Sequence, residues 1–509
     1  MNARLSAERR GLPLLAALAV IFGIIAISKP TYAQAGTYAA IDAFAAIGLS
    51  LLVGNLNQIS VGQAGFFGIG AYTVALLTTQ TPLPFPLALA LGTLAAGLIG
   101  CILGLIALRF RAHYLAMATL AFGLIVVGLF HGSKLFGGAI GIDDVPTPRA
   151  GWLSFSGMTA YWIVWVLALA AAWLTFNILS GPTGRAFEAI RNDELAAETL
   201  GVPTRRHKVS AFSYAGALAG LGGGLYAGFL GIVVPDAVGV ALSIDFLLMA
   251  VLGGAGTVCG ALVGAAFIGF LDVAGHQFEN WREVAYGALV IAVVVAAPGG
   301  LFGWFVRRSR AAAIAPTGGG ALERRASSPQ PGPDATLSAK NVTVRFGGLV
   351  AVNDVSFALK PRTLTSLIGP NGAGKTTLFN AVSGIGRLWS GSIAIAGENV
   401  TGQQPHRIAA RGVGRTFQNA RLFSEMTTVE NVMVGALRVH PGGFFSDALR
   451  LGKSRSDERA AYDRARAILV QLELEPFAAT YARDLPFGVR RRVELARALA
   501  ADPWLLLVD

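Results

Sequence analysis

Nine apolar stretches lie before about residue 305, and they constrain the fold of this chain more than any other feature. The stretches are residues 11–28, 39–54, 64–77, 84–108, 114–130, 161–179, 211–233, 240–273 and 286–302. A helix needs about 20 apolar residues to cross a bilayer core of about 30 Å. Only 14% of all residues are charged, against about a quarter in soluble domains. The sequence therefore predicts an all-α polytopic membrane domain over residues 1–306.

The basic residues orient these stretches, because cytoplasmic loops carry an excess of Lys and Arg. We expect the N-terminus and residues 109–111, 185–208 and 307–310 on the cytoplasmic side. Residues 307–310 can lie on the cytoplasmic side only if the long stretch 240–273 crosses the membrane twice. The glycines at 253, 254 and 256 offer a break between those two crossings. We therefore expect about ten transmembrane helices, or eight or nine if some segments are re-entrant.

Composition also limits the classes of function. The net charge of +12 comes from basic residues scattered in short loops and in the soluble part, which fits anionic lipid headgroups better than nucleic acid. Cys101 and Cys259 lie inside apolar stretches, so the sequence contains neither a disulfide framework nor a metal-ligand spacing. For the first stretch, a signal peptide cleaved near Ala33-Gln34-Ala35 is an alternative to a membrane helix.

Two features interrupt the apolar stretches. Glycines recur every fourth residue at Gly216, Gly220, Gly224 and Gly228, which indicates close packing of a neighbouring helix. A polar island contains Asn55, Asn57, Gln58, Ser60 and Gln63. Polar groups at membrane depth are costly unless they line a path or a protein interior. We favour the simpler interpretation that the island is a cytoplasmic turn between two short helices.

The loop of residues 184–201 is charged, but its apolar residues recur at helical spacing. Phe187, Ile190, Leu195 and Leu200 can form one face, and Gly201 can end the helix. Such a helix between two spans is usually a solvated connector. Here a soluble nucleotide-binding part follows on the same side, so we expect the apolar face to dock onto it.

The soluble part begins after a Gly/Pro/Ser-rich segment, residues 307–335, which is predicted to be a flexible linker. Residues 336–509 then have the sequence pattern of a soluble α/β domain. Residues 337–344 and 350–359 are expected to form paired strands.

A phosphate-loop pattern stands in this second domain, between an expected buried strand at residues 363–368 and an expected helix from Thr377. The candidate ATP-binding residues of the loop are Gly369, Pro370, Asn371, Gly372, Ala373, Gly374, Lys375, Thr376 and Thr377. Backbone N–H groups of such a loop surround phosphates, the lysine reaches the β- and γ-phosphates, and the hydroxyl after it binds Mg²⁺.

Four further positions agree with nucleotide chemistry. Phe346 can stack on adenine, and the amide of Gln418 can reach Mg²⁺ and the attacking water. Leu485, Pro486, Phe487 and Gly488 open a helix whose N-terminus would face a phosphate. Asp509 ends an apolar strand, the usual place for a carboxylate that holds Mg²⁺. The predicted Mg²⁺ ligands are therefore Thr376, Gln418 and Asp509.

Residues 336–509 resemble the ATP-binding cassette (ABC) superfamily, because the loop, Gln418, the 485–488 segment and Asp509 match its Walker A, Q-loop, signature and Walker B motifs in order. Residues 40–303 resemble the permease of the branched-chain amino acid importers. The similar permease segments are 46–54, 66–72, 184–201, 252–257 and 298–303, and residues 415–423 and 485–492 resemble the family's cassette subunit. The resemblance implies an α/β P-loop NTPase fold for the second domain.

The resemblance also implies a function and an assembly. An importer of this family sits in the inner membrane with cytoplasmic cassettes, uses ATP and Mg²⁺, and takes its amino acid from a periplasmic solute-binding protein. A second permease and a second cassette complete it, and the cassettes close over two ATP molecules. Closure would move the docked cytoplasmic loops. Other solutes of the same family, such as other amino acids, amides or urea, remain an alternative.

Two departures from the family pattern matter. Pro486 and Phe487 replace the usual serine and glycine of the signature. The catalytic glutamate that would follow Asp509, and the switch histidine, are absent from the sequence, so no catalytic residue is assigned. From this we expect a cassette truncated after Asp509 that binds ATP weakly and does not hydrolyse it. An ABC exporter or flippase, and an inactive or regulatory membrane protein, remain alternatives of other classes.

Overall fold

The structure is a computed structural model that describes residues 3–27, 30–81, 83–108, 112–150, 153–154, 157–275, 282–297, 299–303 and 337–509. The chain folds as two compact units. The first unit contains Met1–Ser180 and Arg205–Ala313, and the second contains Gly181–Thr204 and Ile314–Asp509. The predicted linker, residues 307–335, lies outside the described residues.

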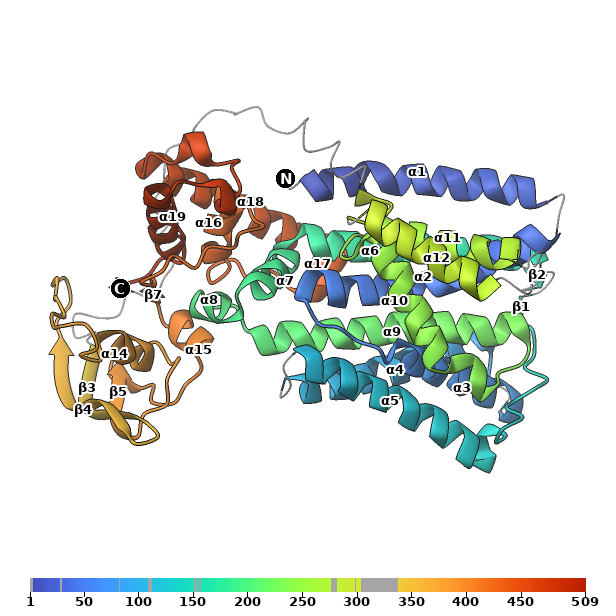
Figure 1. Cartoon of the computed structure of the whole chain (residues 1–509), viewed down its shortest axis with the longest axis horizontal. Helices are drawn as coiled ribbons and strands as arrows, with labels where there is room; N and C mark the ends of the chain where they lie inside the picture. Colours follow the sequence, from blue (N-terminus) through green and yellow to red (C-terminus); the bar gives the residue numbers. More distant parts are fainter. Residues whose placement is uncertain are drawn as a thin grey trace. The chain divides into compact units, whose positions relative to one another are not determined.

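The first unit is helical, as predicted. Its longer helices are α1 (Ala3–Ala26), α2 (Pro30–Leu56), α3 (Gln63–Gln80), α4 (Phe85–Ala107), α5 (Ala112–Gly132), α6 (Gly157–Ser180), α9 (Thr204–Leu230), α10 (Val240–Gly254), α11 (Val258–Gly275) and α12 (Arg282–Ala296). Short elements η1 (Lys134–Phe136), β1 (Arg149–Ala150), β2 (Leu153–Ser154) and η2 (Pro235–Val238) connect them. In Figure 1, α1 runs along one side of the bundle and α5 along the other.

Six helices in the described part of the chain are long and apolar enough to cross a membrane. These segments are Leu5–Ala26, Thr31–Leu56, Phe85–Ala107, Tyr114–Gly132, Gly157–Ser180 and Pro235–Gly254. The expected break inside residues 240–273 is present, because α10 ends at Gly254 and α11 begins at Val258. The first unit is thus a helical domain with several apolar spans, and the number of about ten crossings stays a prediction.

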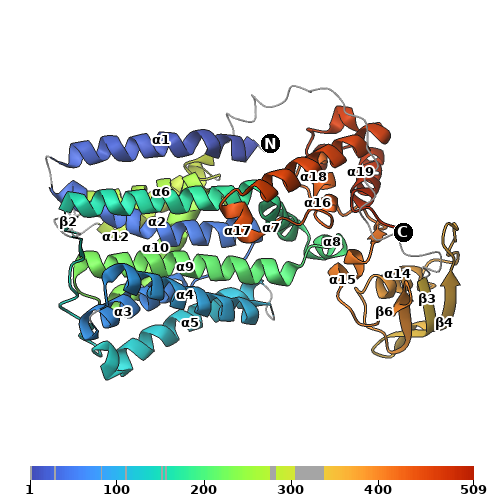
Figure 2. The same ribbon diagram turned by 180° about the vertical axis from the view of Figure 1, so that it is seen from behind.

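The glycine stripe of α9 packs against α3 and α4, as its spacing indicated. A Cβ atom added to Gly70 of α3 would lie 2.0 Å from the carbonyl oxygen of Gly220, and one added to Gly220 would lie 2.4 Å from the Cβ of Ala96 in α4. Helices in lipid associate mainly through such close contacts. Figure 2 shows α4 and α9 running beside each other from the opposite side of the molecule.

The second unit contains α7 (Pro182–Asn192) and α8 (Glu194–Thr199) together with the whole nucleotide-binding domain. Its strands are β3 (Leu337–Phe346), β4 (Leu349–Leu359), β5 (Ser390–Ile395), β6 (Glu398–Asn399), β7 (Val413–Arg415) and β8 (Leu505–Leu507). Its other helices are α14 (Lys375–Val382), α15 (Pro405–Ala410), α16 (Thr428–Ala436), α17 (Phe444–Ala448), α18 (Gly452–Gln471), η4 (Glu475–Phe477), η5 (Ala482–Asp484) and α19 (Phe487–Ala500).

Two hydrophobic cores stabilise this unit. The antiparallel sheet β4-β3-β5-β6 packs its inner face on α14, and the parallel pair β7-β8 adds Val413 and Leu507 to the same core. A second core lies between α16, α18 and α19, which are grouped together in Figure 1. The predicted strand pair is confirmed, because β3 and β4 are antiparallel neighbours from Leu337↔Leu359 to Phe346↔Leu349.

The buried strand expected at residues 363–368 is not formed. This segment has no strand assignment, and Leu364 and Ile368 are 100% and 89% exposed. A strand needs a neighbour that pairs with its backbone groups, and in the described residues β7 and β8 pair with each other instead. An apolar run alone was therefore not sufficient evidence for a strand.

Candidate nucleotide-binding site and docking surface

The phosphate loop leads directly into α14. Gly372 and Gly374 adopt φ angles of 85° and 84°, which L side chains rarely adopt, and Gly374 is the N-cap of the helix. Lys375 Nζ donates to the carbonyl oxygens of Gly369 and Pro370, at 2.6 and 2.7 Å. The loop thus gathers a lysine cation and a helix N-terminus at one exposed place, which is a favourable site for an anion.

Thr376 and Asp509, two of the predicted Mg²⁺ ligands, lie together. The Thr376 hydroxyl donates to Asp509 Oδ1 at 3.3 Å, although 133 positions separate the two residues. The parallel pairing of β8 with β7 brings the aspartate to this place, because Asp509 lies two residues after the end of β8. One hydroxyl and one carboxylate beside a phosphate loop form a hard-oxygen donor set that suits Mg²⁺.

Arg415, at the end of β7, is a site residue that the sequence analysis did not assign. Its Nη2 lies 3.4 Å from Asp509 Oδ2, and its Nη1 donates to Ser383 Oγ at 3.1 Å. Burial lowers the pKa of the Arg415 guanidinium from its ordinary value, and the Asp509 carboxylate opposes that shift. Arg415 therefore contacts the carboxylate oxygen of Asp509 that Thr376 does not.

The remaining predicted residues are not brought to this pair. Gln418 is exposed, and within the described residues no hydrogen bond joins its side chain to Thr376 or Asp509. Phe346 is 59% exposed at the end of β3. In the signature segment, Leu485 is buried while Pro486, Phe487 and Gly488 are exposed at the start of α19. Exposure leaves these groups available to a partner, and their predicted roles stay predictions.

The Gln418 segment is held on α19 by three side chains of that helix. Arg491 donates to the carbonyl oxygens of Phe417, at 2.9 Å, and of Gln418. Glu494 accepts the Phe417 N–H at 3.0 Å, and Arg497 donates to the Arg421 carbonyl at 2.7 Å. Burial lowers the pKa of Arg497 to about 10, and the Glu494 carboxylate opposes this shift. The segment is therefore rigidly attached to the helix that begins with the signature.

The segment that was predicted to dock is folded against the nucleotide-binding domain, within the same unit. The side chain of Asp447, from α17, is completely buried and accepts three hydrogen bonds. Its Oδ2 accepts from the backbone N–H and the hydroxyl of Thr183, at 3.0 and 2.5 Å, and its Oδ1 accepts from Ser454 at 2.6 Å. Asp447 thus caps the first turn of α7 from another element.

Polar contacts continue along the docking segment. Arg185 pairs with Glu458 at 2.5 Å, and Arg421 pairs with Asp193 at 3.0 Å. Ser424 donates to Asn192 Oδ1 at 3.2 Å. Because Arg421 also belongs to the segment that α19 holds, one residue joins the Gln418 segment to the docking segment.

The predicted apolar face is confirmed, but the segment is two helices rather than one. Phe187, Ile190 and Leu200 are buried, and Leu195 is partly buried. Asp193 ends α7, and its side chain accepts from the Ala196 N–H at 2.9 Å, so that it caps α8. Aspartate is more favourable at a helix N-cap than in a helix interior, because its side chain accepts hydrogen bonds from nearby backbone N–H groups.

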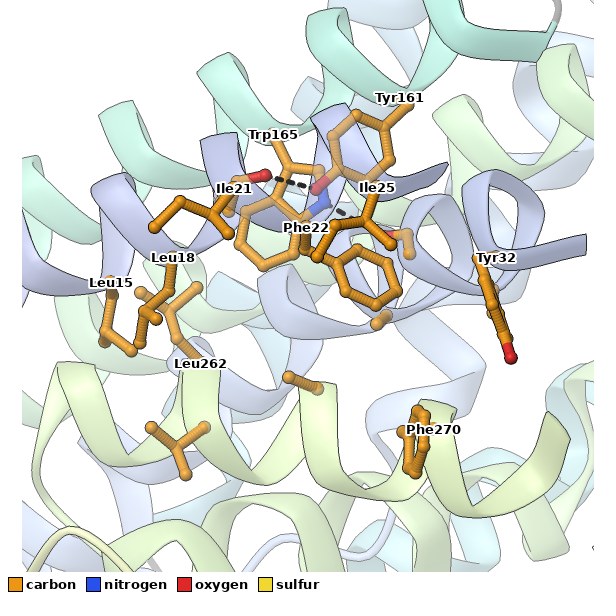
Figure 3. Close-up of a pocket in the computed structure, with 16 residues that line it drawn as sticks. Leu15, Leu18, Ile21, Phe22, Ile25, Tyr32, Tyr161, Trp165, Leu262 and Phe270 are labelled. Carbon is orange, nitrogen blue, oxygen red and sulfur yellow. Dashed lines mark hydrogen bonds between the residues drawn. The ribbon is translucent and has the colours of Figure 1, made fainter. Parts of the chain in front are cut away.

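A separate cavity of about 430 Å³ lies in the helical unit, lined by α1, α2, α6 and α11. Figure 3 shows Phe22, Ile25 and Phe270 facing it. Two of its polar side chains are paired, because Tyr161 donates to the Ala19 carbonyl at 2.6 Å and Trp165 donates to the Gly36 carbonyl at 3.1 Å. None of the described residues that line the cavity is charged, so it suits an apolar molecule better than a nucleotide.

These features define a class: a polytopic helical protein that carries a phosphate-loop nucleotide-binding domain in the same chain. Comparison with known families agrees. Residues 32–296 match the family described as branched-chain amino acid transport system / permease component, and residues 352–509 match the ABC transporter family. The chain therefore belongs to the branched-chain amino acid transport permease family and carries an ABC transporter domain.

Individual relatives match the two parts separately. The second part is 42% identical over 173 residues to the high-affinity branched-chain amino acid transport ATP-binding protein BraF of Pseudomonas aeruginosa, covering 34% of this chain and 68% of BraF. The first part is 32% identical over 280 residues to the permease protein LivM of Escherichia coli K12, covering 50% of this chain and 66% of LivM. A solved ATP-binding cassette in its ADP conformation is 30% identical, with a TM-score of 0.29, covering 34% of this chain and 67% of that structure.

Proposed function

We propose that this chain imports branched-chain amino acids by ATP-driven transport, with the permease and the ATP-binding subunit in one polypeptide. The observation that carries the proposal is the fusion itself: residues 32–296 match the permease family, and residues 352–509 match the ABC transporter family. Relatives of both parts carry branched-chain amino acid transport in their names.

The phosphate loop is the proposed ATP site. Lys375 and the N-terminus of α14 would bind the phosphates, and Phe346 would stack on the adenine. The 3.3 Å contact between Thr376 and Asp509 supports these two residues as holders of Mg²⁺, with Gln418 as a third. When bound, Mg²⁺ would supply positive charge beside the phosphates. Arg415 keeps the aspartate in place by its contact at 3.4 Å.

The docking segment is the proposed mechanical link. Nucleotide contacts at Gln418 would shift the segment that α19 holds, and Arg421 would pass that shift to Asp193, which lies 3.0 Å away. Asp447 would keep α7 attached during the movement, because it is buried and accepts both Thr183 bonds. The permease would then alternate between its outward-facing and inward-facing states.

The proposed assembly is a multi-pass complex in the inner membrane with its cassette in the cytoplasm. The chain would work with a periplasmic solute-binding protein, a second permease and a second ATP-binding cassette, and the exposed signature segment, residues 486–488, would contact the nucleotide on that second cassette. Lipid is the remaining partner, and the apolar exposed faces of helices such as α1 and α4 suit it.

The test is solute uptake into proteoliposomes that contain the assembled transporter, ATP inside and the solute-binding protein outside. We expect ATP-dependent uptake of radiolabelled leucine that unlabelled isoleucine and valine suppress and that urea and glutamine do not. Suppression by urea or an amide instead would assign the chain to another solute of the same family. Absence of ATP-dependent uptake of any of these solutes would contradict the proposal.

A further inference from the structure

The connection between α2 and α3, residues 57–62, is partly enclosed by the helical unit: Asn57 is exposed, whereas Ser60 and Gly62 are buried. Ser60 and Gln63 are completely buried. Gln63 Nε2 donates to the carbonyl oxygen of Ala215 at 3.0 Å. Ala215 lies in α9, four residues after the start of the apolar stretch 211–233 and so about 6 Å along the helix from that start. The expected cytoplasmic turn is therefore a break between two helices that the bundle partly encloses.

Groups from other helices hold the backbone of this break. The Val61 N–H donates to Thr119 Oγ1 of α5 at 2.9 Å, and the Ala64 N–H donates to Ser243 Oγ of α10 at 3.0 Å. The Gln58 N–H donates to the Leu52 carbonyl at 2.9 Å. Non-helical backbone at membrane depth is tolerated only where protein buries it or where it lines a cavity or path. These three hydrogen bonds thus hold the backbone of the break within the bundle.

Three polar atoms at the break have no hydrogen-bond partner in the described structure: Asn55 Oδ1, Ser60 Oγ and Gln63 Oε1. All three side chains are at least nine-tenths buried, with exposures of 9%, 0% and 0%. Leaving such an atom unpaired costs about 1–3 kcal/mol. Two of the three are amide carbonyl oxygens that can only accept, and the third is a hydroxyl. The group that would satisfy them is a multiple donor, and an ammonium carries three N–H bonds.

We propose that this break is a binding site on the solute path, where Asn55, Ser60 and Gln63 accept hydrogen bonds from the α-ammonium group of the amino acid. The N-terminus of α3 starts at the same place, and its partial positive charge suits the carboxylate of a zwitterion. Phe66 and Phe67 follow in the first turns of α3 and are buried against Phe122 and Phe246, at ring distances of 4.9 and 5.5 Å. They supply an apolar wall for an aliphatic side chain. The inference rests on the proposed function.

The test is cysteine accessibility in the assembled transporter, in a background where Cys101 and Cys259 are replaced by alanine. Ser60→Cys is treated with a small ammonium-bearing thiol reagent, with and without leucine. We expect labelling, slowed about tenfold by leucine at about ten times its Kd, because the unoccupied fraction falls by that factor. The deaminated analogue 4-methylpentanoate should not protect. Asn55→Cys is the second variant, should Ser60→Cys fail to fold.

A matched control is Thr73→Cys on α3, the helix that follows the break, because its native hydroxyl is already paired with the Ile69 carbonyl at 2.6 Å. Its labelling should not respond to leucine. The proposed binding site would be overturned if residues 55 and 60 are not labelled, or if leucine leaves their labelling unchanged while uptake proceeds. Either result would indicate a structural cluster of polar groups that water fills. Protection by 4-methylpentanoate equal to that by leucine would remove the role of the ammonium. Absence of leucine uptake by the unmodified transporter would instead count against the proposed function.

Discussion

Gly374 shows how much of the nucleotide site depends on single backbone positions. Its φ angle is 84°, and a Cβ atom there would lie 2.2 Å from the Ala351 carbonyl oxygen. Gly372 has a similar φ of 85° but open space around it. Gly374→Ala should therefore weaken binding of a fluorescent ATP analogue much more than Gly372→Ala. At Gly372 the only cost is about 1–2 kcal/mol for placing alanine in the left-handed backbone conformation. Equal losses in the two variants would show that the contact with Ala351 does not matter.

Asp447 is the residue that attaches α7. Asp447→Ala removes the acceptor of the Thr183 N–H, the Thr183 hydroxyl and the Ser454 hydroxyl, so the cassette unit should lose about 1–3 kcal/mol of unfolding free energy. Thermal unfolding of the purified chain measures this loss. Asp463→Ala, at an exposed position of α18, is the matched control and should unfold as the unmodified chain does. An unchanged midpoint for Asp447→Ala would contradict the capping role.

The sequence permits predictions at residues whose identity the chemistry dictates. Lys375, Thr376 and Asp509 were predicted because phosphate and Mg²⁺ limit which side chains can serve, and the structure brings Thr376 and Asp509 to 3.3 Å. Asp447 and Arg415 could not be assigned in this way, because a buried aspartate or arginine has meaning only through the groups it contacts. The polar island was recognised, but the burial of Ser60 and Gln63 was not predicted, since it depends on helices far away in the sequence.

At the scale of elements, the docking segment depends on a charge pair that can be exchanged. Arg421→Asp and Asp193→Arg should each lower the amount of leucine taken up per ATP hydrolysed, and the double variant should recover most of it. The pair is partly exposed, with side-chain exposures of 43% and 24%, so its stability contribution is at most about 1 kcal/mol. The readout is therefore coupling measured in proteoliposomes, not unfolding.

Reversal of Arg466 and Glu475, an ion pair at 3.0 Å between α18 and η4, is the control for this exchange and should leave the coupling ratio unchanged. Failure of the double variant to recover coupling, with both single variants impaired, would show that the two residues act independently and not as a pair.

Elements were predicted well where periodicity and burial agree. The apolar stretches predicted the helices of the first unit, and the glycines at 253, 254 and 256 predicted the break between α10 and α11. The helical spacing of apolar residues and Gly201 predicted the apolar face of the docking segment. The strand at residues 363–368 was wrong, because its apolar run satisfied the pattern while no neighbouring strand pairs with it. The split of the docking segment at Asp193 was also missed, since capping by one side chain overrides a continuous helical pattern.

At the scale of the whole molecule, a nucleotide site, a docking segment and a polar break between helices would act together in one transport cycle. Each part has its own chemistry: anion binding at the phosphate loop, buried capping by Asp447, and unpaired acceptors at residues 55, 60 and 63. Their joint operation requires that ATP binding at Lys375 reach the permease through residues 415–421 and the docking segment.

The most direct measurement is leucine uptake into proteoliposomes that contain the assembled transporter, with Lys375→Ala compared with the unmodified chain at equal protein and ATP concentrations. Because Lys375 is the cation of the phosphate loop, its loss should abolish nucleotide-dependent accumulation and leave only passive leak. Accumulation by Lys375→Ala at the unmodified rate would contradict the account, since leucine would then move without ATP bound at this site.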